Sequence, residues 1–232
     1  MLSRTADNLY WLARYVERAE YLARILEATQ RLTATPLTYV GESNEWESAV
    51  ATAGCANAFY AVFPEANEEN VTDFLAFSYD NPSSIRSCFE AARTNARAVR
   101  TALTMEMWDA INGTWLELKR YGNGPTSREE LSRFLRWVQE SSLLFDGSAY
   151  RTMLRNDAYS FTRLGVFMER ADNTARILDV NITCCSRRMS MSAVRSIISN
   201  GRRSCARSRR SRRITGSIAR ASSPGWWPTS LS

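Results

Sequence analysis

The 232-residue sequence contains no histidine. This absence removes the commonest metal ligand and the usual general base, and with them every serine–histidine or cysteine–histidine nucleophile pair. It also removes the Glu-x-x-His pairs with which carboxylate-bridged helical bundles hold metal ions. We therefore predict no metal ion, no cofactor and no catalytic residue, and the sequence favours a non-enzyme while leaving the question open.

Other signals are also missing. No apolar run approaches the roughly 20 residues of a membrane-spanning helix, and the charged N-terminus has no apolar core of the kind found in signal peptides. Phosphate-binding glycine loops, Cys-x-x-Cys pairs and serine nucleophile elbows do not occur. The five cysteines follow no regular framework, which is typical of reduced thiols. We therefore expect a cytoplasmic protein that does not bind membranes.

Charge is unevenly divided along the chain. The net charge is +6, yet residues 181–232 contain 11 arginines and no acidic residue, so residues 1–180 carry a net negative charge. This division predicts a helical domain over 1–180, followed by an irregular Arg/Ser-rich tail over 181–232.

Residues 1–180 show helical periodicity nearly throughout. Capping residues and helix breakers predict helices over 3–32, 45–54, 68–78, 80–112, 113–122, 126–145 and 157–180. No segment alternates apolar and polar residues as a half-buried strand does. The predicted fold class is therefore all-α, an antiparallel helical bundle.

Two helices of this bundle are near copies. The sequence ERAEYLARILE at 17–27 reappears as ERADNTARILD at 169–179, displaced by 152 positions. Helical spacing places apolar residues of each copy on one stripe. These residues are Leu12, Val16, Ala19, Ala23 and Leu26 in the first copy, and Leu164, Met168, Ala171, Ala175 and Leu178 in the second. The small alanines predict that the two helices pack side by side through these stripes.

Charged side chains lie beside both stripes. If the helices face each other across a pseudo-twofold axis, their carboxylates and guanidinium groups converge, and the arginines are suited to bind a carboxylate or phosphate bidentately. The alternative is that the charges form structural ion pairs that only flank a helix seam. Arg97 is a further candidate, because the sequence EAARTNAR at 90–97 is a weak third copy of the repeat. The candidate ligand-binding residues are Arg14, Glu17, Arg18, Glu20, Arg24, Arg97, Glu169, Arg170, Asp172 and Arg176.

Three segments resemble the bacterial alpha-E domain family: MLSRTADNLYWLARYVERAEYLARILE, ARTNARAVRTALTMEMWDAIN and FTRLGVFMERADNTARILDV. The resemblance covers residues 1–180 and implies an all-helical domain of unknown biochemical function. It also implies partners, because members occur alongside ATP-grasp amide-ligase-like and transglutaminase-like proteins. An accessory role in a peptide- or amide-bond system follows, with an enzyme or anionic small-molecule binding subunit as the alternative. Thr94 and Val166 depart from the family pattern, which has an acid and an arginine there.

After residue 180 the family pattern continues as helix, whereas this chain becomes rich in arginine and serine. Codons read one base earlier permit YHLLLPE near 181–188 and HWVYRxxIKPWLVADL near 214–230, and both resemble the missing continuation. We therefore predict a frameshift near residue 181 and a disordered, out-of-frame tail. The alternative is a natural basic tail that binds nucleic acid or acidic partners, which we disfavour.

Overall fold

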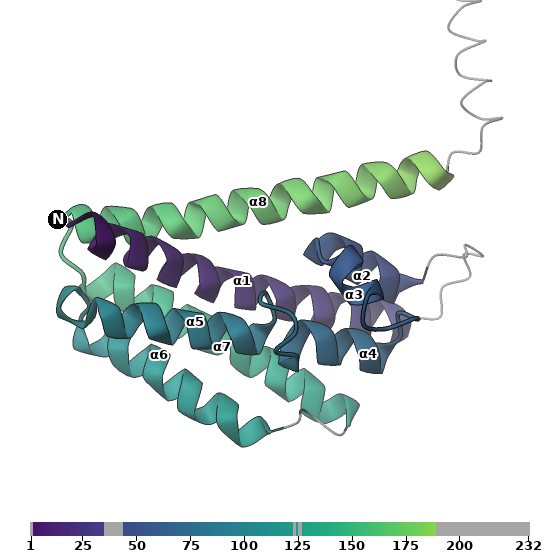
Figure 1. Ribbon diagram of the computed structural model, residues 1–232, viewed down its shortest axis with the longest axis horizontal. Helices are drawn as coiled ribbons and strands as arrows, with labels where there is room; N and C mark the ends of the chain where they lie inside the picture. Colours follow the sequence, from purple (N-terminus) through teal and green to yellow (C-terminus); the bar gives the residue numbers. More distant parts are fainter. Residues whose placement is uncertain (1, 35–43, 123, 125–126, 189–232) are drawn as a thin grey trace, which may run out of the picture. The chain divides into compact units, whose positions relative to one another are not determined.

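The structure, a computed structural model, describes residues 2–34, 44–122, 124 and 127–188, with side chains up to residue 180. The chain divides into two units, 1–182 and 183–232, and the description below concerns the first. The described residues form helices and no strand, which confirms the all-α fold class (Figure 1). Residues 181–188 of the predicted tail belong to the last helix, and the rest of that tail lies outside the described residues.

Eight α-helices follow one another in the described parts of the chain, with three short helical turns between them. In chain order they are α1 (Ser3–Ala34), α2 (Glu45–Ala53), α3 (Ala56–Tyr60), α4 (Glu68–Thr72), the π-helical turn η1 (Asp73–Phe77), α5 (Ile85–Ala98), the 3-10 turn η2 (Arg100–Ala102), α6 (Met105–Leu118), the 3-10 turn η3 (Lys119–Tyr121), α7 (Arg128–Thr152) and α8 (Asp157–Arg188). None of these helices has a stretch that is both long and apolar enough to cross a membrane.

Side-chain caps define several helix starts. Asn44, Ser84, Thr104 and Ser127 each accept a hydrogen bond from a backbone N–H in the first turn that follows. Such caps satisfy donors that have no partner inside the helix. Gly54 ends α2 in the left-handed conformation, with φ of 73°, which glycine adopts without steric cost.

Some of the predicted helix boundaries are wrong. The single helix predicted over 80–112 is two helices, because the chain leaves α5 at Val99 and Thr104 caps the start of α6. Helical periodicity continues on both sides of this break and conceals it. The helix predicted to end at residue 145 continues to Thr152, since its buried face extends through Ala149. The short helix α3 was not predicted.

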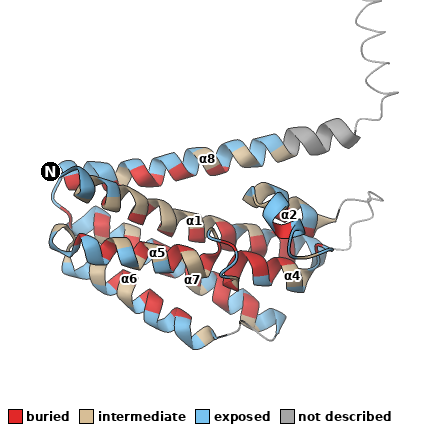
Figure 2. Cartoon of the chain, in the orientation of Figure 1, coloured by how far each residue is buried: buried red, intermediate tan, exposed pale blue. Residues whose placement is uncertain are grey.

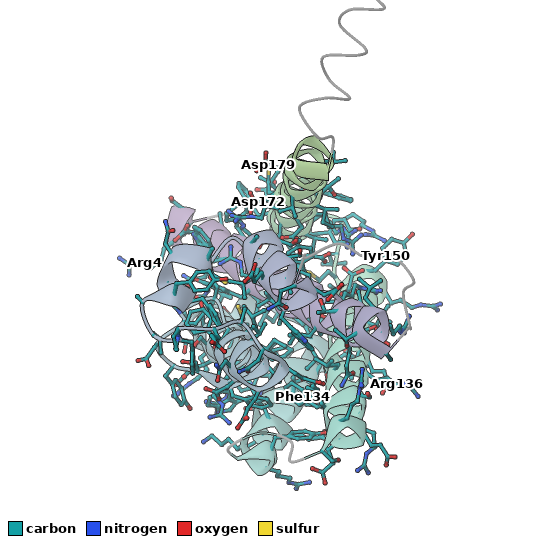
Figure 3. The ribbon with its side chains drawn as sticks, turned by 90° about the vertical axis from the view of Figure 1, so that its right-hand side faces the viewer. Arg4, Phe134, Arg136, Tyr150, Asp172 and Asp179 are labelled. Carbon is teal, nitrogen blue, oxygen red and sulfur yellow. The ribbon has the colours of Figure 1, made fainter. Side chains whose placement is uncertain are left out.

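The apolar core lies among α1, α5, α6 and α7 and extends to the short helices α2, α3 and α4 and the turn η1, and α1 packs chiefly against α5 and α7. The predicted stripe of α1, from Leu12 to Leu26, is buried throughout (Figure 2). Phe134 of α7 is likewise fully buried, whereas Asp172 and Asp179 lie on α8 at the edge of the bundle (Figure 3). The N-terminal helix is therefore the central element of the fold.

Helix α8 runs alongside α1 in the same direction, and it adds little to the apolar core. Of its described side chains, only Ala158 belongs to that core. Its predicted stripe is exposed: Leu164 is 47% exposed, Met168 48% and Leu178 56%. The prediction that the two stripes face each other is therefore wrong, because α8 turns a different and mostly polar face toward α1.

Candidate functional site

The repeated Glu-Arg dipeptides meet where α8 lies against α1. Arg18 donates from Nε to Glu169 Oε1 at 2.7 Å and from Nη2 to Oε2 at 3.1 Å. Arg170 donates in the same manner to Glu17, at 2.7 Å from Nε to Oε1 and 3.2 Å from Nη2 to Oε2. We call these two bidentate ion pairs the ER pairs. Because residues 17 and 18 correspond to 169 and 170 in the repeat, a pseudo-twofold axis along the helices relates the two pairs.

Glycine allows the two helices to approach this closely. A Cβ placed on Gly165 would lie 2.3 Å from the carbonyl oxygen of Tyr10 and 3.1 Å from the Cβ of Ala13. About two turns further along α8, the Tyr21 hydroxyl of α1 lies 3.4 Å from the carbonyl oxygen of Asn173. The contact between α1 and α8 therefore joins equivalent positions of the two repeats along three helical turns.

The two ER pairs differ in their surroundings. Arg14 donates a further hydrogen bond to Glu169 Oε2 at 2.6 Å, so that carboxylate accepts from two guanidinium groups and is only 1% exposed. The equivalent of Arg14 in the second repeat is Val166, which donates nothing, and Glu17 is left with Arg170 alone. The departure from the family pattern noted at residue 166 thus distinguishes the two ER pairs. Glu169 is buried and accepts three hydrogen bonds, whereas Glu17 has one arginine partner, which is 49% exposed.

Burial and charge act in opposite directions on these groups. Burial by itself would lower the pKa of Arg14 and of Arg18, but their hydrogen bonds to Glu169 and its charge outweigh that effect and raise both pKa values. Burial raises the pKa of Glu17, and Arg170 offsets this only in part. The guanidinium of Arg14 also lies 5.1 Å from the centre of the Trp11 ring, within cation–π range.

The other predicted site residues do not join this group. Arg24 pairs with Glu20 at 2.6 Å and Arg176 with Asp172 at 3.1 Å, both within one helix. Arg97 is exposed on α5 and takes part in none of the ion pairs among the described residues. Of the ten candidates, the structure brings five together: Arg14, Glu17, Arg18, Glu169 and Arg170.

The guanidinium groups of the three arginines in this group already donate hydrogen bonds to Glu17 and Glu169. A ligand anion would have to displace Glu17 or Glu169 from its arginines to bind in the predicted manner, and anion binding at this cluster stays a prediction. Within the described residues, no three His, Cys, Asp or Glu side chains gather so that they could hold a metal ion. An open depression lined by Thr5, Leu103 and Met153 lies elsewhere and includes none of the candidates.

Two contacts that hold α8 in place were not predicted from the sequence. Arg163 forms an ion pair with Asp146 of α7. Gly165 allows the backbone of α8 to approach that of α1. A glycine inside a helical pattern often has a packing reason, and that signal was available at residue 165. Nothing local in the sequence marked the pairing of Arg163.

Two described thiols lie near these charged residues. Cys88 is buried near Arg18 and Glu169, and Cys55 is partly exposed near Arg176. Burial raises the pKa of Cys88 to about 12 and that of Cys55 to about 11. The pKa of a cysteine thiol in an unfolded chain is about 8.5. Since the folded-state pKa is raised, the stability that each thiol contributes is present below about pH 8.5 and is lost as the pH rises through the folded-state value.

We therefore expect iodoacetamide at pH 9 to leave Cys88 unmodified in the folded chain and to alkylate it in urea. Peptide mapping by mass spectrometry measures both outcomes. Rapid alkylation of Cys88 in the folded chain would contradict its burial.

The local ion pairs are expected to matter little. Arg24 is 58% exposed and Arg176 41%, and exposed pairs within a helix contribute only about 0–1 kcal/mol. The double substitution Arg24→Gln with Arg176→Gln should lower the free energy of unfolding by no more than about 1 kcal/mol, measured by urea denaturation. A loss as large as that of a buried pair would show that these arginines have partners besides Glu20 and Asp172.

Comparison with known proteins identifies the family. The model of a family described as an alpha-helical domain with a conserved ER motif, named Alpha-E, matches residues 1–205. The chain belongs to the Alpha-E family. Its two Glu-Arg dipeptides form the ER pairs, so the motif that describes the family is here an interhelical contact.

Two mycobacterial proteins are similar to this Alpha-E domain. They are the uncharacterized protein Mb2597 of Mycobacterium bovis and the uncharacterized protein MT2643 of Mycobacterium tuberculosis. Each is 23% identical over 186 residues, which cover 72% of this chain and 21% of the relative. The chain therefore spans about a fifth of the length of the curated relatives it matches. No solved structure matches it significantly.

Proposed function

We propose that this Alpha-E domain is a non-catalytic accessory domain that binds another protein of a peptide- or amide-bond system. The proposed partners are the ATP-grasp amide-ligase-like and transglutaminase-like proteins with which such domains occur. The observation that carries the proposal is the division of roles between the faces of α8. Its charged face is used inside the domain, while its apolar face is exposed to solvent.

The charged groups of the ER pairs bind one another within the domain, which argues against catalysis at this site. A group that transfers protons or attacks a substrate must reach the substrate, and Glu169 is enclosed by Arg14 and Arg18. The two described thiols, Cys55 and Cys88, have raised pKa values, so neither is a nucleophilic thiolate near neutral pH. These features support a binding role over a catalytic one.

The length of the relatives supports an accessory role. The matched part makes up 21% of each mycobacterial protein, so a domain of this kind forms a small part of a much longer polypeptide there. A domain whose charged residues form ion pairs with one another is suited to positioning other domains or proteins.

The proposal is tested with the purified chain and an ATP-grasp amide-ligase-like protein of the kind that occurs alongside such domains. We expect saturable association by isothermal titration calorimetry, a changed rate of ATP consumption by the partner, and no ATP consumption by the chain alone. The transglutaminase-like protein is tested in parallel.

Association with neither protein would refute the accessory role, and amide formation by the chain alone would show an enzyme. The alternative of an anionic ligand is tested with inorganic phosphate and glutamate. A rise in melting temperature that Arg18→Gln abolishes would favour it.

A further inference from the structure

The pseudo-twofold axis extends beyond the ER pairs. Buried residues of α8 include Thr162, Gly165 and Asn173, and the last two lie against α1. Their equivalents in the first repeat are Tyr10, Ala13 and Tyr21. The carbonyl oxygen of Tyr10 and the Cβ of Ala13 lie against Gly165, and the Tyr21 hydroxyl lies against Asn173. Both helices thus use the same face of the repeat for their mutual contact.

The remaining faces of the two helices have different surroundings. On α1 the stripe of Leu12, Val16, Ala19, Ala23 and Leu26 is covered, chiefly by α5 and α7. We call the equivalent residues of α8 the outer stripe: Leu164, Met168, Ala171, Ala175 and Leu178. All five are exposed. The rotation that places α1 on α8 would carry α5 onto the outer stripe, where the described part of the chain has no helix.

We propose that the outer stripe is the docking site for a helix of a partner protein, with an uncharged, alanine-containing face like the one that α5 turns toward the core. This inference rests on the accessory role proposed above and specifies the surface that performs it. The face of α5 in question contains Phe89, Ala92 and Ala96, all of which are buried.

The composition of α8 defines the chemistry of this partner. Residues 160, 161, 164, 167, 168, 171, 174, 175 and 178 share the outer side of the helix and are uncharged, while Asp157 and Asp179 lie at the two ends of this side. A partner helix with a charged contact face would bury those charges without compensation, which is strongly unfavourable. Ala171 and Ala175 at the centre allow a close approach, while the larger side chains at both ends supply apolar area.

The length of polypeptide around the domain points to a partner outside the described helices. In the mycobacterial relatives, about four fifths of the polypeptide lies outside the matched part. In this chain, the sequence of residues 189–232 is rich in arginine and has no apolar period, so it does not encode such a face. The α5 helix of the same domain is already packed against α1.

A labelled peptide of residues 84–100, which carries the α5 face, is the probe for this site. We expect saturable binding to the full chain by fluorescence anisotropy. Ala171→Glu should weaken that binding by about tenfold or more, since a buried charge would oppose the apolar contact. Ala171 is exposed, so this variant should fold. The control Leu116→Glu alters an exposed leucine on α6 and should leave the binding unchanged.

A second peptide with Ala92→Glu and Ala96→Glu should not bind. The proposal is overturned if the first peptide shows no saturable binding at about 1 mM, or if Ala171→Glu binds it as well as the parent chain does. It is also overturned if light scattering shows a dimer that Ala171→Glu converts to a monomer, because the occupant is then a second copy. If the ATP-grasp-like protein binds the parent and Ala171→Glu equally, only the docking surface is wrong and the accessory role stands.

Discussion

Glu169→Gln is expected to lower the free energy of unfolding by about 3–5 kcal/mol, because it leaves two partly buried guanidinium groups without their shared carboxylate. Arg14 and Arg18 both donate to this side chain, which is almost inaccessible to solvent. A glutamine oxygen accepts more weakly than a carboxylate and carries no charge to offset the arginines. Urea denaturation at pH 7 measures the loss.

The pseudo-symmetric substitution Glu17→Gln is the matched control. Arg170, the partner of Glu17, is 49% exposed and regains solvent contact when the pair is broken. Burial also raises the pKa of Glu17, so part of the gain from its ion pair is offset by the cost of burying the charge. We expect a loss of only about 1 kcal/mol. Equal losses for the two variants would show that the extra arginine and the burial at Glu169 have no energetic consequence.

Gly165→Ala is expected to lower the free energy of unfolding by about 1–3 kcal/mol. The added methyl group would lie 2.3 Å from a backbone oxygen of α1, so one helix must move and lengthen the ER pairs. Backbone atoms cannot rotate away as the end of a flexible side chain can. Thermal unfolding measures the loss, and hydrogen exchange should show faster opening of α8 than of α5.

Gly147→Ala in α7 is the control for this substitution. A Cβ at Gly147 would meet nothing within 4 Å, so only helix propensity changes. Alanine is favoured over glycine in a helix interior by up to about 1 kcal/mol, and Gly147→Ala should leave stability unchanged or raise it. If both variants were stabilised, the close approach of α1 and α8 at residue 165 would be wrong.

The sequence by itself determined the helical class, most of the helices and the central role of the Glu-Arg repeat. Apolar spacing is a local property, and α1 buries the stripe that this spacing predicts. The i,i+4 pairs of Arg24 and Arg176 were also predictable, because one helix supplies both partners. The break between α5 and α6 was not, since periodicity persists across it.

Only the tertiary structure decided which face of α8 is buried. Periodicity shows that a helix has an apolar face, but burial depends on which other helix lies against that face. In α1 the stripe meets α5 and α7, whereas in α8 the ER pairs and Gly165 direct a polar face inward. The partners in that contact are separated by about 150 residues of chain, so no local pattern could encode their pairing. Nearly identical helices therefore have different roles because they have different neighbours.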